Sequence, residues 1–469
     1  MGDRHGACDA TWFANAAGGE LVNGSNALIE RVETDSRNAG AGSLFVALAG
    51  ERSNGHDYAR KAADSGASAL LVSSTWWSGA GRAALSGLPC PVIVVPDTLA
   101  ALQKAATAWR SRFPSLVRFG VTGSAGKTSV KELLATIVGV SRRTVKNPGN
   151  LNSDIGLPAS IFLIRPEHEA AVFEMGINRP GEMDVLASIY EPDCALISNI
   201  GSAHVGVLGG TREAIAAQKK RIASRFNGTQ SLVVWEDDDY KDALFTDLRG
   251  KAVTYGPRSD DGFEGARDLG FDGWSIRYRG VDTRLRLPGA HNLLNALCAI
   301  RAATLYGASA HDVASGLESV VPLSGRTSIT RGEYTIVDDC YNANAESALA
   351  ALGFCDSVDG SFRRIYVLGS MKELGDESRA SHRKVGSAAA GSSADILVFY
   401  GEEARDAYEA AVESGSGKEI RHFDSYDELE ESVVATVQAG DMVLVKASRS
   451  LELERLVHRL GGTGVAHAS

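Results

Sequence analysis

The stretch Leu116-Val-Arg-Phe-Gly-Val-Thr-Gly-Ser-Ala-Gly-Lys-Thr-Ser129 joins a short apolar run to a glycine-rich loop. The run Leu116–Val121 is typical of a buried parallel strand. After the loop, residues 129–138 place apolar side chains at helical spacing. A strand, a glycine-rich turn and a helix in this order predict an α/β sheet with an anion site at its edge, because a helix N-terminus carries partial positive charge.

The loop has the composition of a nucleotide-binding loop, and we expect it to bind ATP. Gly123 and Gly126 allow backbone N–H groups to turn toward phosphates, Lys127 would meet the β and γ phosphates, and the Thr128 hydroxyl would bind Mg²⁺. The common longer form of this loop needs glycine at position 121, where this chain has valine. The predicted ATP-binding residues are Thr122, Gly123, Ser124, Ala125, Gly126, Lys127, Thr128 and Ser129.

The rest of the chain continues the alternation of strands and helices. We predict an α/β protein of three domains: a smaller N-terminal α/β domain (1–112), a central doubly wound P-loop ATPase-like sheet (113–324) and a C-terminal Rossmann-like domain (325–469). Between about 251 and 288 the pattern changes: residues 274–279 and 283–287 alternate apolar and polar side chains with period two, which predicts a hairpin-rich antiparallel patch.

Composition narrows the class of protein. The formal charge of −10 over 469 residues argues against nucleic-acid binding. Six scattered cysteines predict reduced, mostly buried thiols rather than a disulfide framework or a zinc site. Residues 1–6 carry no apolar segment of a signal peptide, and no apolar run is long enough to cross a membrane. We therefore expect a cytoplasmic monomer without stable membrane association.

Polar side chains follow several central strands. The loop 147–158 carries Asn150 and Asn152 and suits an oxygen-rich ligand, although an ordinary turn is the alternative. Glu174 follows an apolar strand, where a carboxylate would hold Mg²⁺. His204 follows another strand, and for this residue a structural role is equally open. Lys219 and its neighbour Lys220 lie on the next helix, where a solvated basic face is the simpler interpretation.

The C-terminal block repeats the pattern. Asp338-Asp-Cys-Tyr-Asn-Ala-Asn344 follows a strand and concentrates acids, amides and a phenol. Gly369–Gly375 and Lys446–Arg449 end two further strands. Because carboxyl ends of parallel strands meet at one edge, these segments predict a substrate pocket.

In their order and spacing, these motifs resemble the Mur ligase family of cell-wall synthesis from Thr34 to about Val457. The resemblance is greatest to the members that add D-alanyl-D-alanine to UDP-N-acetylmuramoyl tripeptide, through 338–344 and 371–375. It implies that Glu174 and His204 serve metal ions and that Lys219 is carbamylated and binds metal. Arg221, where many relatives have Glu, leaves Lys220 as the competing position.

The resemblance also implies how each ligand is bound. Asn295 would meet adenine, and Arg326 and Asp339 would close over the nucleotide. Thr34–Arg37 and Gly50–His56 would hold the uridine diphosphate end of the substrate. The remaining substrate-binding candidates complete the set: Ser36, Arg37, Asn54, His56, Asn150, Asn152, Tyr341, Asn342 and Asn344.

The expected reaction is amide formation through an acyl phosphate, with Lys127, Glu174, His204 and Lys219 as the catalytic set. The alternatives are a related Mur ligase that adds another amino acid and a folylpolyglutamate synthase-like ligase. The segment 34–56 argues against the folate enzyme, which would not need a UDP site. An ATP- or GTP-dependent switch is disfavoured because the chain has no Asn-Lys-x-Asp motif.

Overall fold

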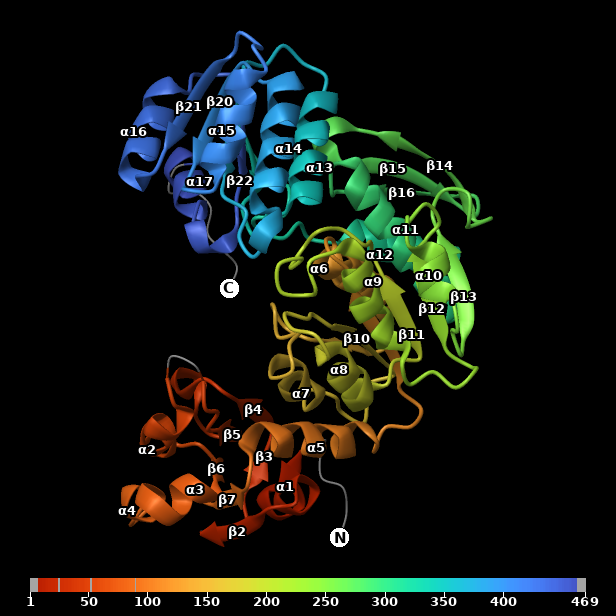
Figure 1. Ribbon diagram of the computed structural model, residues 1–469. Coiled ribbons are helices and arrows are strands. Elements are labelled where there is room, and N and C mark those ends of the chain that lie inside the picture. The colour runs from red at the N-terminus through yellow and green to blue at the C-terminus, as the bar shows by residue number, and fades with distance from the viewer. Residues whose placement is uncertain (1–6, 24–25, 51–52, 89, 462–469) are drawn as a thin grey trace.

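The computed structural model describes residues 7–23, 26–50, 53–88 and 90–461. Three mainly parallel sheets follow one another along the chain, and in Figure 1 the N-terminal and C-terminal sheets lie at opposite ends with the central sheet beside them. The α/β class with three sheet-centred units and an antiparallel patch agrees with the sequence-based expectation. The exact domain limits remain a prediction.

The N-terminal sheet has the order β2-β7-β6-β5-β4, and only β2 runs antiparallel to its neighbour. Its strands are β2 (Glu20–Asn23), β4 (Arg31–Glu33), β5 (Ser43–Val46), β6 (Ala69–Ser73) and β7 (Val92–Val95), and a separate pair is β1 (Cys8–Asp9) with β3 (Leu28–Ile29). The helices of this part are α1 (Ala10–Ala17), α2 (Ala59–Asp64), α3 (Ser74–Trp76), α4 (Arg82–Ala84) and α5 (Thr98–Arg110).

The central sheet is parallel throughout, in the order β13-β12-β11-β8-β10-β9. Its strands are β8 (Val117–Thr122), β9 (Thr144–Lys146), β10 (Ala170–Glu174), β11 (Cys194–Ile197), β12 (Ser231–Trp235) and β13 (Lys251–Tyr255). Its helices are α6 (Lys127–Gly139), α7 (Gly156–Ile161), α8 (Glu182–Tyr190), α9 (Arg212–Lys220), α10 (Lys241–Phe245), α11 (Ala290–Leu305) and α12 (Ala310–Ser319).

Apolar cores cover both faces of this sheet. Val172 of β10 packs in the core that includes α6 and α11, whereas Phe173 packs in the core that includes α5, α7 and α8. Successive residues of a strand point to opposite faces, so a strand covered on both sides must be apolar at every position. This explains the continuous apolar runs of the sequence.

The antiparallel patch is smaller than predicted. Residues 251–255 form β13, the edge strand of the parallel sheet, and only β14 (Phe263–Asp268), β15 (Trp274–Tyr278) and β16 (Val281–Leu285) pair antiparallel. The prediction for residues 251–255 was therefore wrong. The period-two alternation lies in residues 274–279 and 283–287, whereas residues 251–255 do not alternate, so the predicted patch began too early.

The C-terminal sheet has the order β17-β18-β22-β19-β20-β21, and only β17 is antiparallel to its neighbour. Its strands are β17 (Ser328–Arg331), β18 (Thr335–Asp339), β19 (Arg364–Gly369), β20 (Ile396–Tyr400), β21 (Glu419–Phe423) and β22 (Met442–Lys446). Its helices are α13 (Ala345–Ser357), α14 (Ser378–Gly391), α15 (Ala404–Glu413), α16 (Tyr426–Thr436) and α17 (Glu454–Gly461).

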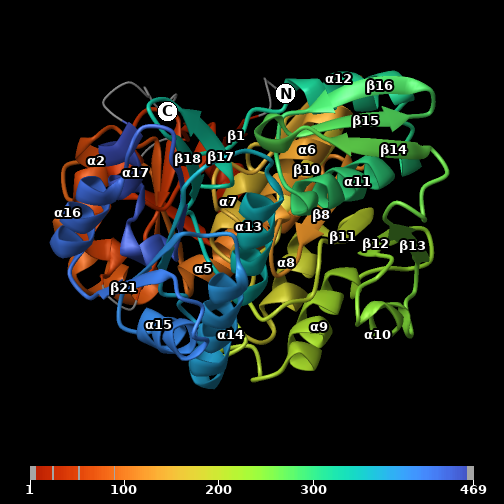
Figure 2. The same ribbon diagram turned by 90° about the horizontal axis from the view of Figure 1, so that it is seen from above.

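Helices connect the three parts. On α5, Trp109 donates to the carbonyl of Ile164 at 3.2 Å and Arg110 to that of Ile189 at 3.1 Å, which attaches the N-terminal part to the central one. Helix α13 lies between the C-terminal sheet and the central part (Figure 2), and its Phe354 ring packs against Phe271 with a centroid distance of 6.2 Å. No helix among residues 7–23, 26–50, 53–88 and 90–461 is long and apolar enough to span a membrane. All six cysteines are free and buried, as expected.

Candidate active site

A cavity of about 640 Å³ lies between the central and C-terminal parts. Its walls are the glycine-rich loop and the ends of β10 and β11 on one side, and the segments after β18, β19 and β22 on the other. The structure thereby gathers most of the predicted site residues: Ser124, Ala125, Gly126, Lys127, Thr128, Ser129, Asn150, Asn152, Glu174, His204, Asn295, Arg326, Asp339, Tyr341, Asn342 and Asn344.

The two loop glycines are required by close contacts. Gly123 has φ +151° and Gly126 has φ +79°, which are backbone conformations that residues with a side chain rarely adopt. A Cβ on Gly126 would lie 2.4 Å from Asn295 Oδ1, and a Cβ on Gly123 would lie 1.9 Å from Ser198 Oγ. Asn295 of α11 therefore lies directly against the loop, although no sequence spacing links the two positions.

Helix α6 begins at Lys127, whose ammonium donates to the carbonyl of Gly123 at 2.9 Å. Burial lowers the pKa of Lys127, and Glu174 opposes that shift. The Thr128 hydroxyl donates to Glu174 Oε2 at 2.7 Å, and Asn152 Nδ2 donates to Glu174 Oε1 at 2.7 Å. A cation, a hydroxyl, an amide and a carboxylate thus surround the space in front of the loop.

Two further residues hold this group in place and were not singled out from the sequence. The Asn147 side chain hydrogen-bonds both backbone polar groups of Glu174. It accepts from the Glu174 N–H at 2.9 Å and donates to the Glu174 carbonyl at 3.1 Å. Lys131 is fully buried and donates to the carbonyl of Asn147 at 2.9 Å. The sequence offered one signal for Lys131, a lysine close behind the loop on a helix that packs against the sheet. If such a lysine is buried, its ammonium needs acceptors nearby.

The C-terminal part reaches into the nucleotide loop. Arg326 Nη2 donates to Thr128 Oγ1 at 2.9 Å, and its guanidinium carbon lies 4.1 Å from the Tyr341 ring centroid. Asn344 Nδ2 lies 3.5 Å from the carbonyl of Ser124. These contacts bring predicted residues of the two parts together.

A second group of contacts joins the loop after β11 to the C-terminal part. The Ser202 N–H and hydroxyl donate to the two carboxylate oxygens of Glu346, both at 2.9 Å. His204 Nδ1 lies 2.7 Å from Glu373 Oε2, and this imidazole lowers the pKa of Glu373. His204 and Glu373 both have positive φ, 61° and 65°. The loop that carries His204 is therefore held by two carboxylates of the C-terminal part.

The structure distinguishes the two adjacent lysines of α9. Lys219 is buried and donates to the carbonyl of Gly123 at 2.9 Å. Burial lowers the pKa of Lys219 well below its usual value, and nearby Lys127 lowers it further. Lys220 points away and donates to the carbonyl of Ala243 at 2.9 Å. Only Lys219 therefore lies beside the nucleotide loop, although it does not line the cavity itself.

Asp339 is held within its own domain. Its Oδ2 lies 2.7 Å from the ammonium of Lys446, which also donates to the carbonyl of Asn342 at 2.7 Å. Asp339 Oδ1 accepts from the Thr327 N–H at 2.9 Å. Buried Lys446 thus fixes the segment that presents Tyr341 and Asn342 to the cavity.

The predicted uridine-diphosphate residues do not line this cavity. Arg37 is exposed and hydrogen-bonded to Asp35, and this contact lowers the pKa of Asp35 to about 2. His56 is buried, and its Nε2 accepts from the Ser73 N–H at 2.9 Å.

The other N-terminal candidates lie close to these two. The Asn54 carboxamide oxygen lies 2.8 Å from His56 Nδ1, and Ser36 begins a short 3₁₀ turn that includes Arg37. Residues 51 and 52, part of the predicted segment, lie outside the described residues, as do residues 1–6 at the N-terminus.

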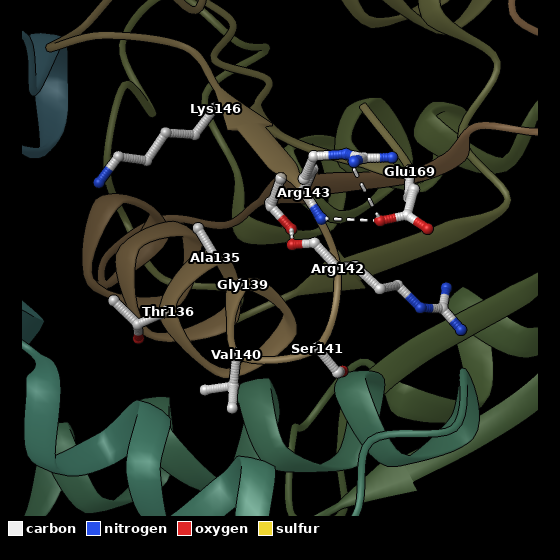
Figure 3. Close-up of a pocket in the computed structure, with 10 residues that line it drawn as sticks. Ala135, Thr136, Gly139, Val140, Ser141, Arg142, Arg143, Lys146 and Glu169 are labelled. Atoms are coloured by element: carbon white, nitrogen blue, oxygen red, sulfur yellow. Dashed lines mark hydrogen bonds and ion pairs between the residues drawn. The ribbon is translucent and has the colours of Figure 1, made fainter. Parts of the chain in front are cut away.

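A separate cavity of about 400 Å³ lies at the opposite end of α6 (Figure 3). Its cations already have protein partners: Arg142 donates to the carbonyl of Tyr306 at 2.6 Å, the Arg143 guanidinium lies 3.9 Å from Glu169 Oε2, and Lys146 pairs with Glu132. None of the predicted site residues lines it. The candidate active site is therefore the cavity between the two parts.

The site suits a metal ion bound together with phosphates rather than alone. Within the described part of the chain, no three His, Cys, Asp or Glu side chains are arranged to hold a metal. Thr128 and Glu174 are nevertheless in direct contact beside the loop. Mg²⁺ usually takes one or two protein ligands plus phosphate oxygens and water, so this pair fits its requirements.

Family models match most of the chain. The Mur ligase family catalytic domain matches residues 28–110, the Mur ligase middle domain residues 121–303 and the Mur ligase glutamate ligase domain residues 325–449. The UDP-N-acetylmuramoyl-tripeptide–D-alanyl-D-alanine ligase of Treponema pallidum is 40% identical, over 91% of this chain and 92% of the relative.

Solved structures agree with these matches. MurF from Acinetobacter baumannii superimposes with a TM-score of 0.85 at 28% identity, covering 97% of this chain and 99% of that one. MurF ligase from Thermotoga maritima in complex with ADP gives 0.75 at 27% identity, covering 92% and 97%. The loop and the strand-end motifs thus meet in one cavity, and the chain is similar to Mur ligases along nearly its whole length. The chain belongs to the Mur ligase family.

Proposed function

We propose that this protein is an ATP-dependent ligase that joins D-alanyl-D-alanine to UDP-N-acetylmuramoyl tripeptide. The observation that carries the proposal is the shared cavity, in which a nucleotide loop faces the polar strand ends of the C-terminal part. The Treponema pallidum relative bears the name of this activity.

The reaction has two steps. A carboxylate oxygen of the tripeptide attacks the γ-phosphorus of ATP, which forms an acyl phosphate and releases ADP. The amine of D-alanyl-D-alanine then attacks the acyl carbon, phosphate leaves with the C–O bond electrons, and the nitrogen loses a proton to give the amide. ATP is needed because a carboxylate is a poor electrophile.

The chain's own residues position and shield these groups. Lys127 and the loop N–H groups would bind and orient the phosphates, and Asn295 would contact the adenine. Arg326 would add positive charge from the C-terminal part. The contacts between the two parts would exclude water, which competes with the amine for the acyl phosphate.

Thr128, Glu174, His204 and a carbamylated Lys219 would hold Mg²⁺. When bound, Mg²⁺ would neutralise charge on the phosphoryl oxygens. Lys219 suits the modification because a neutral amine adds to CO₂, and burial favours the neutral form. ¹³C NMR with labelled CO₂ tests this: a carbamate signal should be present in the wild type and in Lys220→Met and absent in Lys219→Met. A signal unchanged by Lys219→Met would refute the assignment.

Ser36, Arg37, Asn54 and His56 would bind the UDP end of the substrate. They lie in two short 3₁₀ turns of the N-terminal part and do not line the cavity, so the substrate would extend from one part to the other. Isothermal titration of UDP against Arg37→Ala measures this role. Unchanged affinity would remove Arg37 from the site.

The function itself is tested by incubation with ATP, Mg²⁺, UDP-N-acetylmuramoyl tripeptide and D-alanyl-D-alanine. The product mass should increase by one dipeptide residue, with one phosphate released per product. A panel of single amino acids, including glutamate, tests the related ligases. Product formation with glutamate and none with the dipeptide would replace the proposal with the alternative.

A further inference from the structure

We infer that Arg449 binds the terminal carboxylate of the acceptor dipeptide and so selects a two-residue acceptor. The inference rests on the proposed function. Arg449 follows β22 and lines the active-site cavity together with Ser448 and Ser450. The inference goes beyond that proposal because it names the residue that binds the C-terminal carboxylate of the acceptor.

The acceptor is a zwitterion whose carboxylate needs a cation. Five cationic side chains line the cavity: Lys127, Arg326, Lys372, Lys446 and Arg449. The first two belong to the phosphate side, because Lys127 bonds the loop carbonyl of Gly123 and Arg326 bonds Thr128. The acceptor's cation is therefore one of the remaining three, Lys372, Lys446 and Arg449.

Two of these three cations already bind other groups of the protein. Lys446 is buried and held between Asp339 Oδ2 and the carbonyl of Asn342, both at 2.7 Å. The Lys372 ammonium lies 2.5 and 2.6 Å from the two carboxylate oxygens of Glu403.

Arg449 differs from both. Its side chain is 63% exposed, and its one ion pair in the described part of the chain joins Nη1 to Glu454 Oε1 at 2.8 Å. A guanidinium has five N–H donors in a planar fork, so an edge remains for a bidentate carboxylate contact while Glu454 holds the other. Arg449 is thus anchored and still able to bind.

A carboxylate site at Arg449 also bears on acceptor length. The guanidinium carbons of Arg326 and Arg449 lie 4.1 and 6.0 Å from the same Tyr341 ring centroid. An extended dipeptide spans about 7 Å. With the carboxylate held at Arg449, the amine of a dipeptide would reach about 3.5 Å further from that residue than the amine of a single alanine.

The experiment compares D-alanyl-D-alanine with its C-terminal amide in steady-state ligation. The wild type should prefer the free carboxylate by about 10- to 100-fold in kcat/KM, the effect of one charged hydrogen-bonding pair. Arg449→Gln should raise the KM for the free dipeptide by a similar factor, leave the KM for ATP within about threefold and abolish the preference. Arg449→Lys should restore part of it.

Arg405→Gln is the matched control, because Arg405 is an exposed arginine of the same domain that pairs with Asp424. It should retain the full preference. Equal kcat/KM of the wild type for the free dipeptide and its amide would overturn the inference. A preference for the free dipeptide that persists in Arg449→Gln would also overturn it. Absence of product with either acceptor would instead refute the proposed function.

Discussion

Arg326 Nη2 donates a hydrogen bond to Thr128 Oγ1 at 2.9 Å, across 198 positions of sequence. The donor belongs to the C-terminal part and the acceptor to the first turn of the helix after the glycine-rich loop. The proposed nucleotide site is therefore assembled from two parts of the chain. Substitutions on either side should affect the same reaction.

Lys127→Ala should abolish ligation while the fold persists. The variant removes the ammonium that would meet the phosphates, and loss of one such charge from a preorganised site costs about 10²- to 10³-fold in kcat. Phosphate release measures the rate, and circular dichroism with substrate binding measures the fold. Ligation at near wild-type rate in a folded variant would contradict the mechanism.

Gly126→Ala should weaken nucleotide binding severely. The new Cβ would lie 2.4 Å from Asn295 Oδ1 at a residue with φ +79°, so the loop must shift. Titration with ADP measures the affinity.

Gly139→Ala is the control for that variant, on the same helix. A Cβ there meets nothing within 4 Å, so binding should be retained and stability should rise by up to about 1 kcal/mol. Equal ADP affinity in both variants would show that the loop tolerates a side chain.

In CO₂-free buffer, where Lys219 carries its free amine, Lys219→Met should flatten the alkaline pH dependence of stability. Burial lowers the folded pKa of Lys219, so between that value and the ordinary value of 10.5 the unfolded chain binds more protons. Stability from this residue therefore rises with pH in that window, by at most about 1.4 kcal/mol per pH unit.

The measurement is urea unfolding between pH 7 and pH 10, with the difference between wild type and variant as the quantity of interest. Lys220→Met is the matched control, because Lys220 is not buried. It should keep the wild-type slope. Identical slopes for both variants would show that Lys219 titrates normally.

Ser202→Ala and Glu346→Gln should each reduce kcat/KM for the acceptor, and their effects should not add. Glu346 accepts two hydrogen bonds from Ser202 across the boundary between the parts, so either change loosens the same contact. A double-mutant cycle should give a coupling energy of about 1 kcal/mol. Full additivity would mean that this contact does not contribute to the active arrangement.

Local sequence determined the elements and the chemistry that each one carries. The apolar run, the glycines and the helical spacing of residues 116–138 sufficed for the strand, loop and helix, because these signals act between neighbours in the chain. The phosphate-binding roles of Lys127 and Thr128 stay predictions from the same local pattern. The error at residues 251–255 arose because this segment has no period-two signal of its own, and its parallel pairing with β12 is a contact between distant segments.

Tertiary structure decided which residues meet. The contact of Asn295 with Gly126, the hydrogen bonds between Asn147 and Glu174 and the burial of Lys219 rather than Lys220 join positions whose spacing has no regular period. Such contacts depend on how helices pack on both faces of a sheet and on how the C-terminal part docks. The sequence by itself thus determined a glycine-rich loop between a strand and a helix, and three α/β units, and packing between distant segments brought them together around one cavity.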